Sequence, residues 1–496
     1  MYKRQPYGFA RQHGVVIAPS EGGAWLATLR EDANPAVLIE VKRYLAQPLR
    51  VATASVADFD RLLSDHYAVD SSAAAMAGSV GNNDIDFSLP SAEDLLDSAD
   101  DAPAIRLINA IIAEAVRQGV SDIHIEPYES GLVVRMRTDG VLREHLRMPP
   151  HVAPVVVSRI KVMARLDIAE RRVPQDGRIG LTLAGKAVDV RVSTLPSRAG
   201  ERVVMRILDK DAAGIDFDVL GLSGTSDQIL REALAEPNGI ILVTGPTGSG
   251  KTTTLYSVLG HLNNEKVNIM TLEDPVEYPL PLIRQTSLSD SIKMDFSEGI
   301  RSMMRQDPDI ILVGEVRDKD TAEMAFRAAM TGHQVFSTLH TNSAIRSIPR
   351  LVDLGIKPEV LAGNVIGIIA QRLVRTWGKA CKAPDSPNPI EAQMLGLAPG
   401  EDLRIYRPVG CAVCEEQGYK GRLSIMELLK FDAELDELVT QRASLKAIAD
   451  HLNQNGFIPM AQDGLRRVRD GSTTVEEIGP VSYTHLRANE TVLDLV

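Results

Sequence analysis

Hydrophobic and polar positions along the chain alternate between strand-like and helix-like periods, and the changes of period mark out domains. Up to about residue 67, short apolar runs such as "GVVIAP" and "AWLATL" alternate with helical stretches. Residues 103–119 have apolar positions every three to four residues, which is typical of an amphipathic helix. Strand-like runs follow to residue 209, with Asp139-Gly140 as a hairpin turn signal. The pattern predicts two small α+β domains, at residues 1–80 and 103–209.

A third block, residues 223–480, alternates short apolar strands with helical segments. Its strands include the short, largely apolar segments "GIILVTG", "VNIMTLED", "DIILVGEVRD" and "HQVFSTLHT". Strands of this kind are buried on both faces, so we expect a parallel sheet covered by helices on both sides. Two linkers are expected, at residues 81–102 and 210–222. The first is acidic, with seven acidic and no basic residues from Asp84 to Asp101, as in a solvated, flexible segment.

The composition narrows the classes of function. A net charge of −12 argues against non-specific nucleic-acid binding by the chain as a whole. Three cysteines in 496 residues form no disulfide framework, which fits a reducing compartment. No apolar run approaches the ~18 residues of a membrane span and no secretory signal opens the chain, so we expect a cytoplasmic protein that meets a membrane only through partners. The segments "MYKRQ" and 481–496 resemble translated adapter sequence, and we expect a non-native tail at 481–496.

A phosphate-binding loop follows the strand "GIILVTG". Residues 245–252, "GPTGSGKT", fit the pattern G-x-x-x-x-G-K-[ST] between a strand and a helix. Glycines allow backbone N–H groups to turn toward phosphate oxygens, and the helix dipole favours negative charge there. Lys251 supplies positive charge for the β- and γ-phosphates, and the Thr252 hydroxyl is a ligand for Mg²⁺. The predicted nucleotide-binding residues are Gly245, Pro246, Thr247, Gly248, Ser249, Gly250, Lys251, Thr252 and Thr253, with ATP and Mg²⁺ as cofactors.

The ends of the other strands offer the acidic and basic groups that hydrolysis of a nucleotide needs. Glu273 follows an apolar strand at the carboxyl edge, where α/β sheets bind ligands. Glu315 follows another such strand and fits an acid that holds Mg²⁺ through water, while His333 and His340 flank a third. A single acid after a strand is often a helix cap, and a lone histidine is more often structural. Consecutive strand ends that all carry such groups favour a catalytic site.

These elements, in this order and spacing, resemble the Walker A, Asp box, Walker B and His box of the secretion and type IV pilus ATPase superfamily. With "SDIHIEP", "RRVPQDGRI", "DVRVSTLPS" and "GERVVMRILDK", the chain is similar over residues 7–478 to the type II secretion system ATPases. The resemblance implies a RecA-like P-loop ATPase domain with a cysteine-containing subdomain at 377–422, preceded by the two smaller α+β domains. It also implies a homo-hexamer on the cytoplasmic face of the inner membrane, which hydrolyses ATP to drive pseudopilus assembly and protein export. The implied partners are the L-type and F-type components of the inner-membrane secretion platform, with the first domain as a docking domain.

The resemblance also implies roles for individual residues. Glu273 and Glu315 share the water-activating and metal-linked roles, without a ranking between them, and His333 and His340 sense or position the γ-phosphate. A flexible second domain would close over the γ-phosphate and supply arginine-finger charge, although single arginines often form surface ion pairs of little energetic worth. The arginines assigned to the site are Arg191, Arg206, Arg301, Arg305 and Arg422.

Two other functions compete with type II secretion. A type IV pilus assembly ATPase shares every motif of the third block, but the first block and the close fit of residues 103–209 favour secretion. A hexameric nucleic-acid translocase is disfavoured by the net acidity and by the absence of a basic and aromatic stripe. No catalytic element is visibly broken, which argues against an inactive scaffold.

The three cysteines form an incomplete version of a zinc motif. The family that the chain resembles often carries two Cys-x-x-Cys pairs, and here Cys411 and Cys414 form one pair while Gly378 replaces the first cysteine of the other. Cys381, Cys411 and Cys414 are candidate ligands for Zn²⁺, with water or Asp385 as the fourth ligand. Structural zinc sites usually have four protein ligands, so zinc binding stays open at this point and the subdomain is expected to fold with or without the metal.

A second cluster of metal-type residues occurs in "SDIHIEP". Asp122, His124 and Glu126 alternate along a predicted strand and therefore share one face. We interpret them as the solvated face of the strand, above a packed layer of Ile123 and Ile125, rather than as metal ligands.

Overall fold

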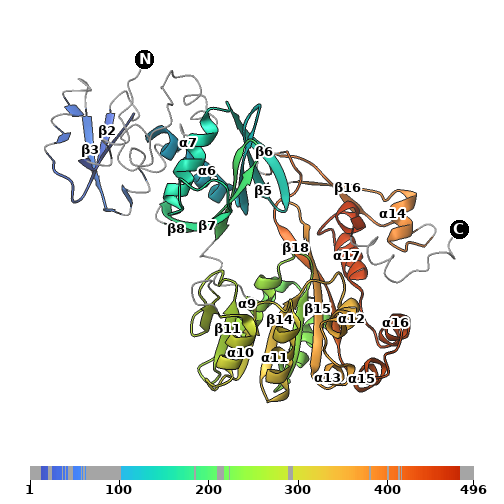
Figure 1. The fold of residues 1–496 in the computed structure, drawn as a ribbon. Helices are drawn as coiled ribbons and strands as arrows, with labels where there is room; N and C mark the ends of the chain where they lie inside the picture. Colours follow the sequence, from blue (N-terminus) through green and yellow to red (C-terminus); the bar gives the residue numbers. More distant parts are fainter. Residues whose placement is uncertain are drawn as a thin grey trace. The chain divides into compact units, whose positions relative to one another are not determined.

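The computed structural model describes residues 102–480, except for 184–185, 209–216, 223, 289–293, 379–380, 399–400, 412–413 and 415, together with parts of residues 10–62. The chain divides into two compact units, Met1–Lys210 and Asp211–Val496, and each is described by itself (Figure 1). Residues 81–101 of the predicted acidic linker, 210–216 of the second linker and the tail 481–496 lie outside the described residues.

The amino-terminal part of the first unit contains a three-stranded sheet. Its strands are β1 (Val15–Pro19), β2 (Trp25–Arg30) and β3 (Leu49–Ala54). Strands β1 and β2 are antiparallel, and β2 and β3 are parallel. Alternate residues of the strands, among them Val15, Ile17, Ala27 and Leu29, form a small buried core.

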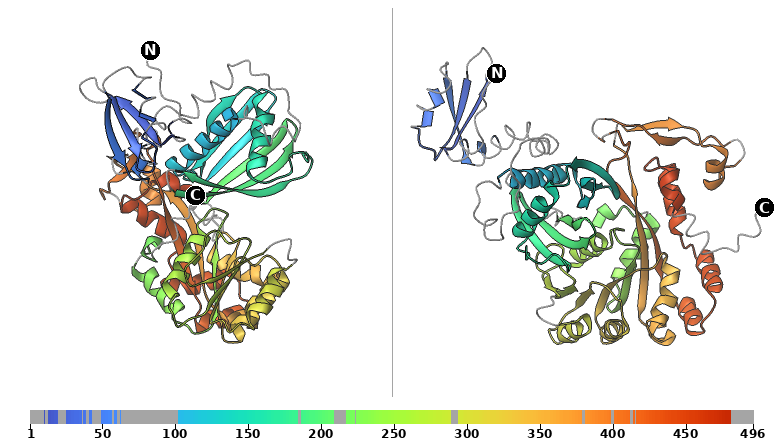
Figure 2. Two further views of the ribbon diagram at one scale, coloured as in Figure 1. Left: turned by 90° about the vertical axis from the view of Figure 1, so that its left-hand side faces the viewer. Right: turned by 45° about the horizontal axis from the view of Figure 1, so that its top comes forward.

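The rest of the first unit is a six-stranded antiparallel sheet in the order β6-β5-β4-β9-β8-β7. Figure 2 shows α6 (Ala102–Gln118) and α7 (Val152–Met163) on one face of this sheet. The apolar stripe of α6 packs on alternate strand residues such as Ile123 and Ile125, as the helical period predicts. The predicted Asp139-Gly140 turn is confirmed, with φ of 49° and 85°. The strands are β4 (Asp122–Tyr128), β5 (Gly131–Thr138), β6 (Val141–Met148), β7 (Gln175–Leu183), β8 (Lys186–Ser197) and β9 (Gly200–Leu208).

The second unit is built on a seven-stranded sheet in the order β12-β11-β13-β14-β10-β15-β18. Its strands are β10 (Gly239–Thr244), β11 (Ile269–Glu273), β12 (Arg284–Ser287), β13 (Ile310–Val313), β14 (Gln334–Leu339), β15 (Val365–Arg375) and β18 (Arg422–Lys430). All neighbouring pairs are parallel except β15 and β18. The four strands named from the sequence, β10, β11, β13 and β14, are parallel as expected. The antiparallel strand β18, which the sequence analysis did not name, follows the inserted subdomain at the edge of the sheet.

Helices cover both faces of this sheet, because alternate residues of each central strand enter opposite cores. Ile240 and Leu242 of β10 pack with α10–α12, whereas Ile241 and Val243 pack with α8 and α9. The helices are α8 (Gly224–Leu234), α9 (Lys251–Leu262), α10 (Phe296–Met303), α11 (Lys319–Met330), α12 (Ala344–Asp353), α13 (Pro358–Ala362), α15 (Ala433–Thr440), α16 (Leu445–Gln454) and α17 (Met460–Arg469), with a 3₁₀ turn at Phe217–Leu220. No helix in the described part of the chain is long and apolar enough to cross a membrane.

A small subdomain is inserted between β15 and β18. It contains the antiparallel pair β16 (Lys382–Asp385) and β17 (Ile405–Pro408), and the short helix α14 (Pro389–Met394). Asn388 and Glu391 form a capping box at the start of α14. The Trp377 indole donates a hydrogen bond of 2.8 Å to the Gly471 carbonyl and stacks on Tyr419, which ties the subdomain to the end of α17.

Candidate nucleotide site

The glycine-rich loop connects β10 to α9, and at some of its positions the backbone has a conformation that favours glycine. Gly245, Gly248 and Gly250 have φ of 146°, 80° and 89°. A Cβ atom at Gly245 would lie 2.4 Å from the Gln371 carbonyl oxygen, so a side chain there would force the loop to move. Gly250 is the N-cap of α9 and provides no side-chain cap, so the first N–H groups of the helix face the loop. This is the backbone that a phosphate-binding helix terminus requires.

Gln371 of β15 holds the loop from behind. Its side chain is 1% exposed, its Nε2 donates to the Ser249 carbonyl at 2.7 Å, and its Oε1 accepts from Thr254 Oγ1 at 2.7 Å. Sequence analysis missed this residue. The available signal was a polar residue inside the apolar run "VIGIIAQRLV", because a buried polar group needs hydrogen-bond partners.

Lys251 is the first residue of α9, and its side chain reaches back to the loop. Its ammonium donates to the carbonyls of Gly245 and Pro246 at 2.8 and 3.2 Å. Burial lowers the pKa of Lys251 below its usual value, and the nearby carboxylate of Glu315 partly offsets this effect. Thr252 and Thr253, in the first turn of α9, are exposed. The lysine and these hydroxyl groups therefore lie together at the start of the helix.

Glu315 and His340 meet at the same edge of the sheet as this loop. The parallel register places Thr244 beside Leu339 and Val313 beside Ser337, so the residues after β10, β13 and β14 share the carboxyl edge. His340 Nε2 lies 3.3 Å from Glu315 Oε2, and Arg317 pairs with the other oxygen of the carboxylate. An acid, a histidine and a lysine thus converge beside the loop.

Glu273 has a different environment from Glu315. It is 5% exposed, and its carboxylate accepts hydrogen bonds from Tyr256 Oη, from Thr271 Oγ1 at 2.5 Å and from Gln285 Nε2 at 3.3 Å. Burial raises the pKa of Glu273 despite these hydrogen bonds. Sequence analysis did not identify Tyr256 or Gln285. The two candidate acids are therefore distinct: one is enclosed by neutral donors and the other lies beside charged side chains.

His333 does not join this site. It precedes β14, where its carbonyl accepts from the Gly239 N–H at 3.1 Å, and Gly239 is the first residue of β10. Six residues of strand, or roughly 20 Å, separate this edge from the loop. Its Nδ1 lies 2.8 Å from the Ala328 carbonyl oxygen, at the end of α11. The prediction that His333 acts at the same site as His340 is wrong within one chain, because the two histidines lie at opposite ends of one strand.

Arg301 and Arg305 also lie away from the loop of their own chain. They belong to the end of α10 and the turn after it, where Arg305 Nη1 donates to the Arg301 carbonyl at 3.0 Å. The next residue, Gln306, accepts from the Asn268 side chain, which directly precedes β11 at the amino edge of the sheet. Arg422 is the first residue of β18, opposite Arg375 and exposed, beyond the carboxyl edge.

Arg191 and Arg206 lie in the first unit, on the sheet face opposite α6 and α7. The register places Asp122, Arg206 and Arg191 directly beside one another on β4, β9 and β8. Arg206 Nε donates to Asp122 Oδ1 at 2.9 Å. Burial acts to raise the pKa of Asp122, but the hydrogen bond from Arg206 and other interactions outweigh it and lower the pKa.

The other residues of "SDIHIEP" are covered by arginines as well. Glu126 is 4% exposed and accepts two hydrogen bonds of 2.7 Å from Arg135, and Arg202 Nη2 lies 2.9 Å from both Glu126 and His124. The expectation that these residues form a solvated face is wrong, because arginines of the neighbouring strands lie over them. They form an ion-pair network, and the described residues contain no metal-type cluster at this place.

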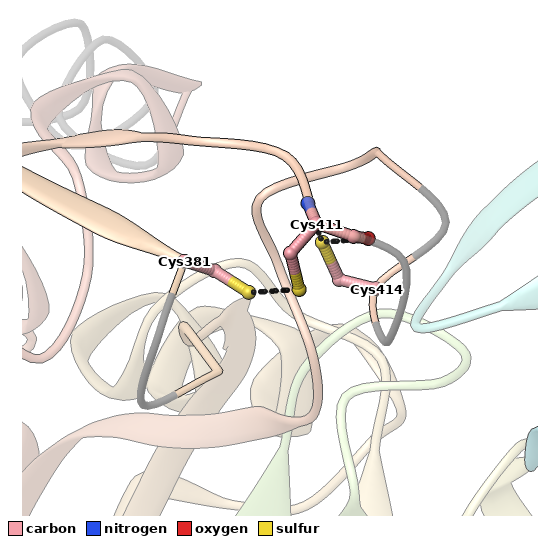
Figure 3. A group of neighbouring side chains, drawn as sticks. All are labelled: Cys381, Cys411 and Cys414. Atoms are coloured by element: carbon pink, nitrogen blue, oxygen red, sulfur yellow. Dashed lines mark hydrogen bonds between the residues drawn. The ribbon is translucent and has the colours of Figure 1, made fainter.

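The three cysteines of the inserted subdomain come together (Figure 3). Their Sγ atoms lie within 4.8 Å of one another, and Cys381 Sγ is 3.2 Å from Cys411 Sγ. Cys414 Sγ accepts from the N–H groups of Cys411 and Gly418 at 3.2 and 3.1 Å. Burial acts to raise the pKa of Cys414, but these backbone hydrogen bonds, together with hydrogen bonds from the thiols of Cys381 and Cys411, outweigh it and lower the pKa to about 7. Zn–S bonds of ~2.3 Å place tetrahedral sulfurs roughly 3.8 Å apart, so the thiols fit three corners of a zinc site.

Asp385 is not the fourth ligand. Its Oδ2 accepts from Arg407 Nε at 2.8 Å, and it is absent from the cluster that the three thiols form. The extended strand β16 carries it away from Cys381.

Comparison with known proteins identifies the family. The family model "Type II/IV secretion system protein" matches residues 97–479. The chain belongs to this family. A second model, which describes an amino-terminal domain of GSPII protein E, matches residues 4–67 of this secretion ATPase. Type II secretion system protein E of Pseudomonas aeruginosa is 46% identical over 481 residues, which are 96% of this chain and 95% of that protein. Type II secretion system ATPase E of Vibrio cholerae is 45% identical over 487 residues, 96% of each chain.

Solved structures agree with the RecA-like ATPase fold. The pilus retraction motor PilT, solved with bound ADP, has a TM-score of 0.50 and 27% identity, and the similarity covers 75% of this chain and 95% of PilT. The Legionella pneumophila ATPase DotB has a TM-score of 0.57 over 76% of this chain and 95% of DotB, with 19% identity, and shows the fold alone. The relatives place the chain in the type II secretion ATPase family, as the sequence motifs predicted.

Proposed function

We propose that this secretion ATPase acts as a homo-hexamer on the cytoplasmic face of the inner membrane and hydrolyses ATP to drive pseudopilus assembly and protein export. The observation that carries the proposal is the convergence of the glycine-rich loop, Lys251, Glu315 and His340 at one sheet edge. In the related structure of PilT a nucleotide, ADP, is bound.

The side chains at this edge suit distinct tasks. N–H groups of the loop and of the first turn of α9 bind the β- and γ-phosphates, and Lys251 balances their charge. Thr252 and Glu315 would hold Mg²⁺, which when bound neutralises phosphate charge and supplies Lewis-acid polarisation. His340, 3.3 Å from Glu315, lies where it can respond to the γ-phosphate. Glu273 is proposed to orient the attacking water after rotating out of its hydrogen-bonded pocket, because its present donors occupy both oxygens.

The arginines support a ring. Arg301 and Arg305 lie at the amino edge of the sheet, away from the loop of their own chain, so a second copy is needed for them to meet phosphate. In the other unit, Arg191 and Arg206 would reach the nucleotide when that unit closes over it, and Arg422 would contribute from β18. A ring of identical chains would bring Arg301 and Arg305 of one copy to the nucleotide of the next copy through one repeated, head-to-tail interface.

The amino-terminal domain is proposed to bind the secretion platform. We favour the L-type component of the platform as its partner and the F-type component as a second partner. The match of this domain to a domain model of GSPII protein E supports this choice, as does the long similarity of the chain to type II secretion proteins. A type IV pilus assembly motor is the second candidate, supported by the likeness to PilT. The domains of the chain are proposed at 1–80, 103–209 and 223–480, joined by the linkers 81–102 and 210–222.

Hydrolysis by the purified, assembled protein tests the enzymatic part of this proposal. Lys251→Ala and Glu315→Gln should each lower the ATPase rate by at least about a hundredfold, as removal of a phosphate-binding or metal-linked group does. Lys266→Ala, an exposed lysine beyond α9, is the matched control and should leave the rate unchanged. Normal rates in both site variants would refute the assignment. Restoration of secretion, but not of pilus formation, in cells that lack the chain would separate the two systems.

A further inference from the structure

A chain of hydroxyl groups links the glycine-rich loop to α12. Thr244 is the last residue of β10, directly before Gly245, and is fully buried. Its Oγ1 lies 2.7 Å from the Oγ1 of Thr341, which in turn lies 2.7 Å from the Oγ of Ser347 in α12. The link therefore begins at the residue that precedes the loop and passes through the residue that follows His340.

Backbone groups add to the contact between Thr244 and Thr341. The Thr341 N–H donates to Thr244 Oγ1 at 2.8 Å, and the Thr244 hydroxyl lies 3.2 Å from the Thr341 carbonyl oxygen. The parallel pairing of β10 with β14 ends at Thr244 and Leu339, so these contacts continue the attachment of the two segments past the end of the ladder. The side chain of Thr244 thus takes over where backbone pairing stops.

The backbone on either side of His340 determines where its imidazole lies. The His340 side chain is 48% exposed, so burial does not fix it, and it lies 3.3 Å from Glu315. Leu339, before it, is buried at the end of β14, and Thr341, after it, is held by the hydroxyl link. The position of the imidazole relative to the loop consequently depends on the contact between Thr341 and Thr244.

A different threonine holds Glu315. Thr338 Oγ1 donates to the Gly314 carbonyl at 2.8 Å, and the Thr338 carbonyl accepts from the Val316 N–H at 3.0 Å. Gly314 and Val316 flank Glu315, so Thr338 fixes the acid relative to β14. Thr244 has the separate task of fixing the histidine segment relative to the loop, and the two tasks can be perturbed one at a time.

We propose that Thr244 and Thr341 are positioning residues that hold His340 at a fixed place relative to the phosphate-binding loop, where the imidazole meets the γ-phosphate. This inference rests on the proposed function, in which the loop binds the phosphates of ATP and His340 responds to the γ-phosphate. The threonines act through the histidine, and a displacement of roughly 1 Å at a reacting group lowers a rate by up to about a hundredfold. Loss of the link should affect ATP hydrolysis far more than ADP binding, because ADP has no γ-phosphate.

Thr244→Val in the purified, assembled protein tests the proposal, because valine has nearly the shape of threonine without the hydroxyl. The kcat for ATP should fall at least about fivefold, while the Kd for ADP stays within about twofold of the parent value. Thr244→Ser keeps the hydroxyl and should retain kcat within about twofold, as should the control Thr440→Val, at an exposed position in α15. An unchanged kcat in Thr244→Val, or a loss of ADP affinity as large as the loss of kcat, would overturn the proposal.

A double-mutant cycle with His340→Ala separates this inference from the proposed function. If the threonine acts through the histidine, Thr244→Val should lower kcat by less than about twofold in the His340→Ala background. The same loss in both backgrounds would exclude the positioning role and leave the role of His340 intact. A normal kcat in His340→Ala alone would refute the proposed role of the histidine, and this inference with it. Thr341→Val should show the same pattern as Thr244→Val, which keeps the proposal testable if Thr244→Val does not fold.

Discussion

Replacement of Gln371 by leucine tests whether the shape of the phosphate-binding loop depends on a side chain of β15. The glutamine is 1% exposed and makes two hydrogen bonds of 2.7 Å, to the Ser249 carbonyl and from Thr254 Oγ1. Leucine has a similar volume, so the change removes both hydrogen bonds without opening a large cavity. The buried partners of Gln371 are then left unsatisfied.

The magnitude follows from these two partners. A buried polar group that loses its hydrogen bond costs ~1–3 kcal/mol, so two such groups cost about 2–6 kcal/mol. Part of this cost lowers the free energy of unfolding, and part is relieved when the loop moves away from its phosphate-binding shape. If ~1.4 kcal/mol of this cost must be met to restore the phosphate-binding shape of the loop when nucleotide binds, nucleotide affinity falls tenfold. We therefore expect Gln371→Leu to weaken ATP binding by at least about tenfold and to lower stability measurably.

Titration with a fluorescent ATP analogue and denaturant unfolding measure the two effects. Gln454→Leu, at an exposed position in the last turn of α16, is the matched control and should change neither. Gln371→Glu keeps an acceptor for Thr254 but loses the donor to Ser249 and adds negative charge behind the phosphates, so it should weaken binding as well. Unchanged affinity and unchanged unfolding in Gln371→Leu would refute the role of this side chain.

Three further predictions concern histidines, a buried ion pair and a buried acid. In steady-state ATPase assays His340→Ala should lower kcat by at least about tenfold, whereas His333→Ala should stay within about threefold of the parent rate. Equal losses in the two variants would contradict the conclusion that only His340 lies at the site. Glu201 is buried and lies 2.7 Å from the Lys161 ammonium, so Lys161→Met leaves it without its partner and should lower the free energy of unfolding in denaturant by ~3–5 kcal/mol. Combining Lys161→Met with Glu201→Leu should restore most of this free energy. A double variant as unstable as the single one would refute the account. Burial raises the pKa of Glu427 to about 7, so the folded chain holds this proton more tightly than the unfolded chain. As pH rises from about 4.5 through 7, the free energy of unfolding of the wild type should fall by on the order of 3 kcal/mol relative to that of Glu427→Gln. Parallel profiles of stability against pH for the two proteins would contradict this.

The parts of the site that the sequence predicted are contiguous in the chain or follow from the direction of strands. The loop and its lysine form one segment, and Glu315 follows a strand whose carboxyl edge a parallel sheet turns toward ligands. The same rule excludes His333, because that residue precedes its strand rather than following it. The error came from treating both ends of "QVFSTL" alike.

The missed residues are distant in sequence from the groups that they hold. Gln371 and Thr254 are 117 positions apart, and Tyr256 and Glu273 are 17 apart. Only the pairing of β10 with β15 and the packing of α9 on the sheet bring these side chains together. Alternation along β4 correctly placed Asp122, His124 and Glu126 on one face, but period alone does not report that arginines of β5 and β9 cover that face.

The proposed role of Arg206 at the nucleotide would have a consequence for control of hydrolysis. The loop, Lys251 and Glu315 belong to one unit, whereas Arg206 belongs to the other and is paired with Asp122. The side chain of Arg206 is 51% exposed, whereas that of Asp122 is 11% exposed and has a second cationic neighbour, Arg137, at 3.8 Å. Both a carboxylate and a γ-phosphate accept charge-assisted hydrogen bonds from an arginine, but the phosphate carries more negative charge and more acceptor oxygens. In the proposed mechanism Asp122 would position Arg206 when no nucleotide is near, and the positive charge at the phosphate would then be conditional on movement of the first unit rather than permanent.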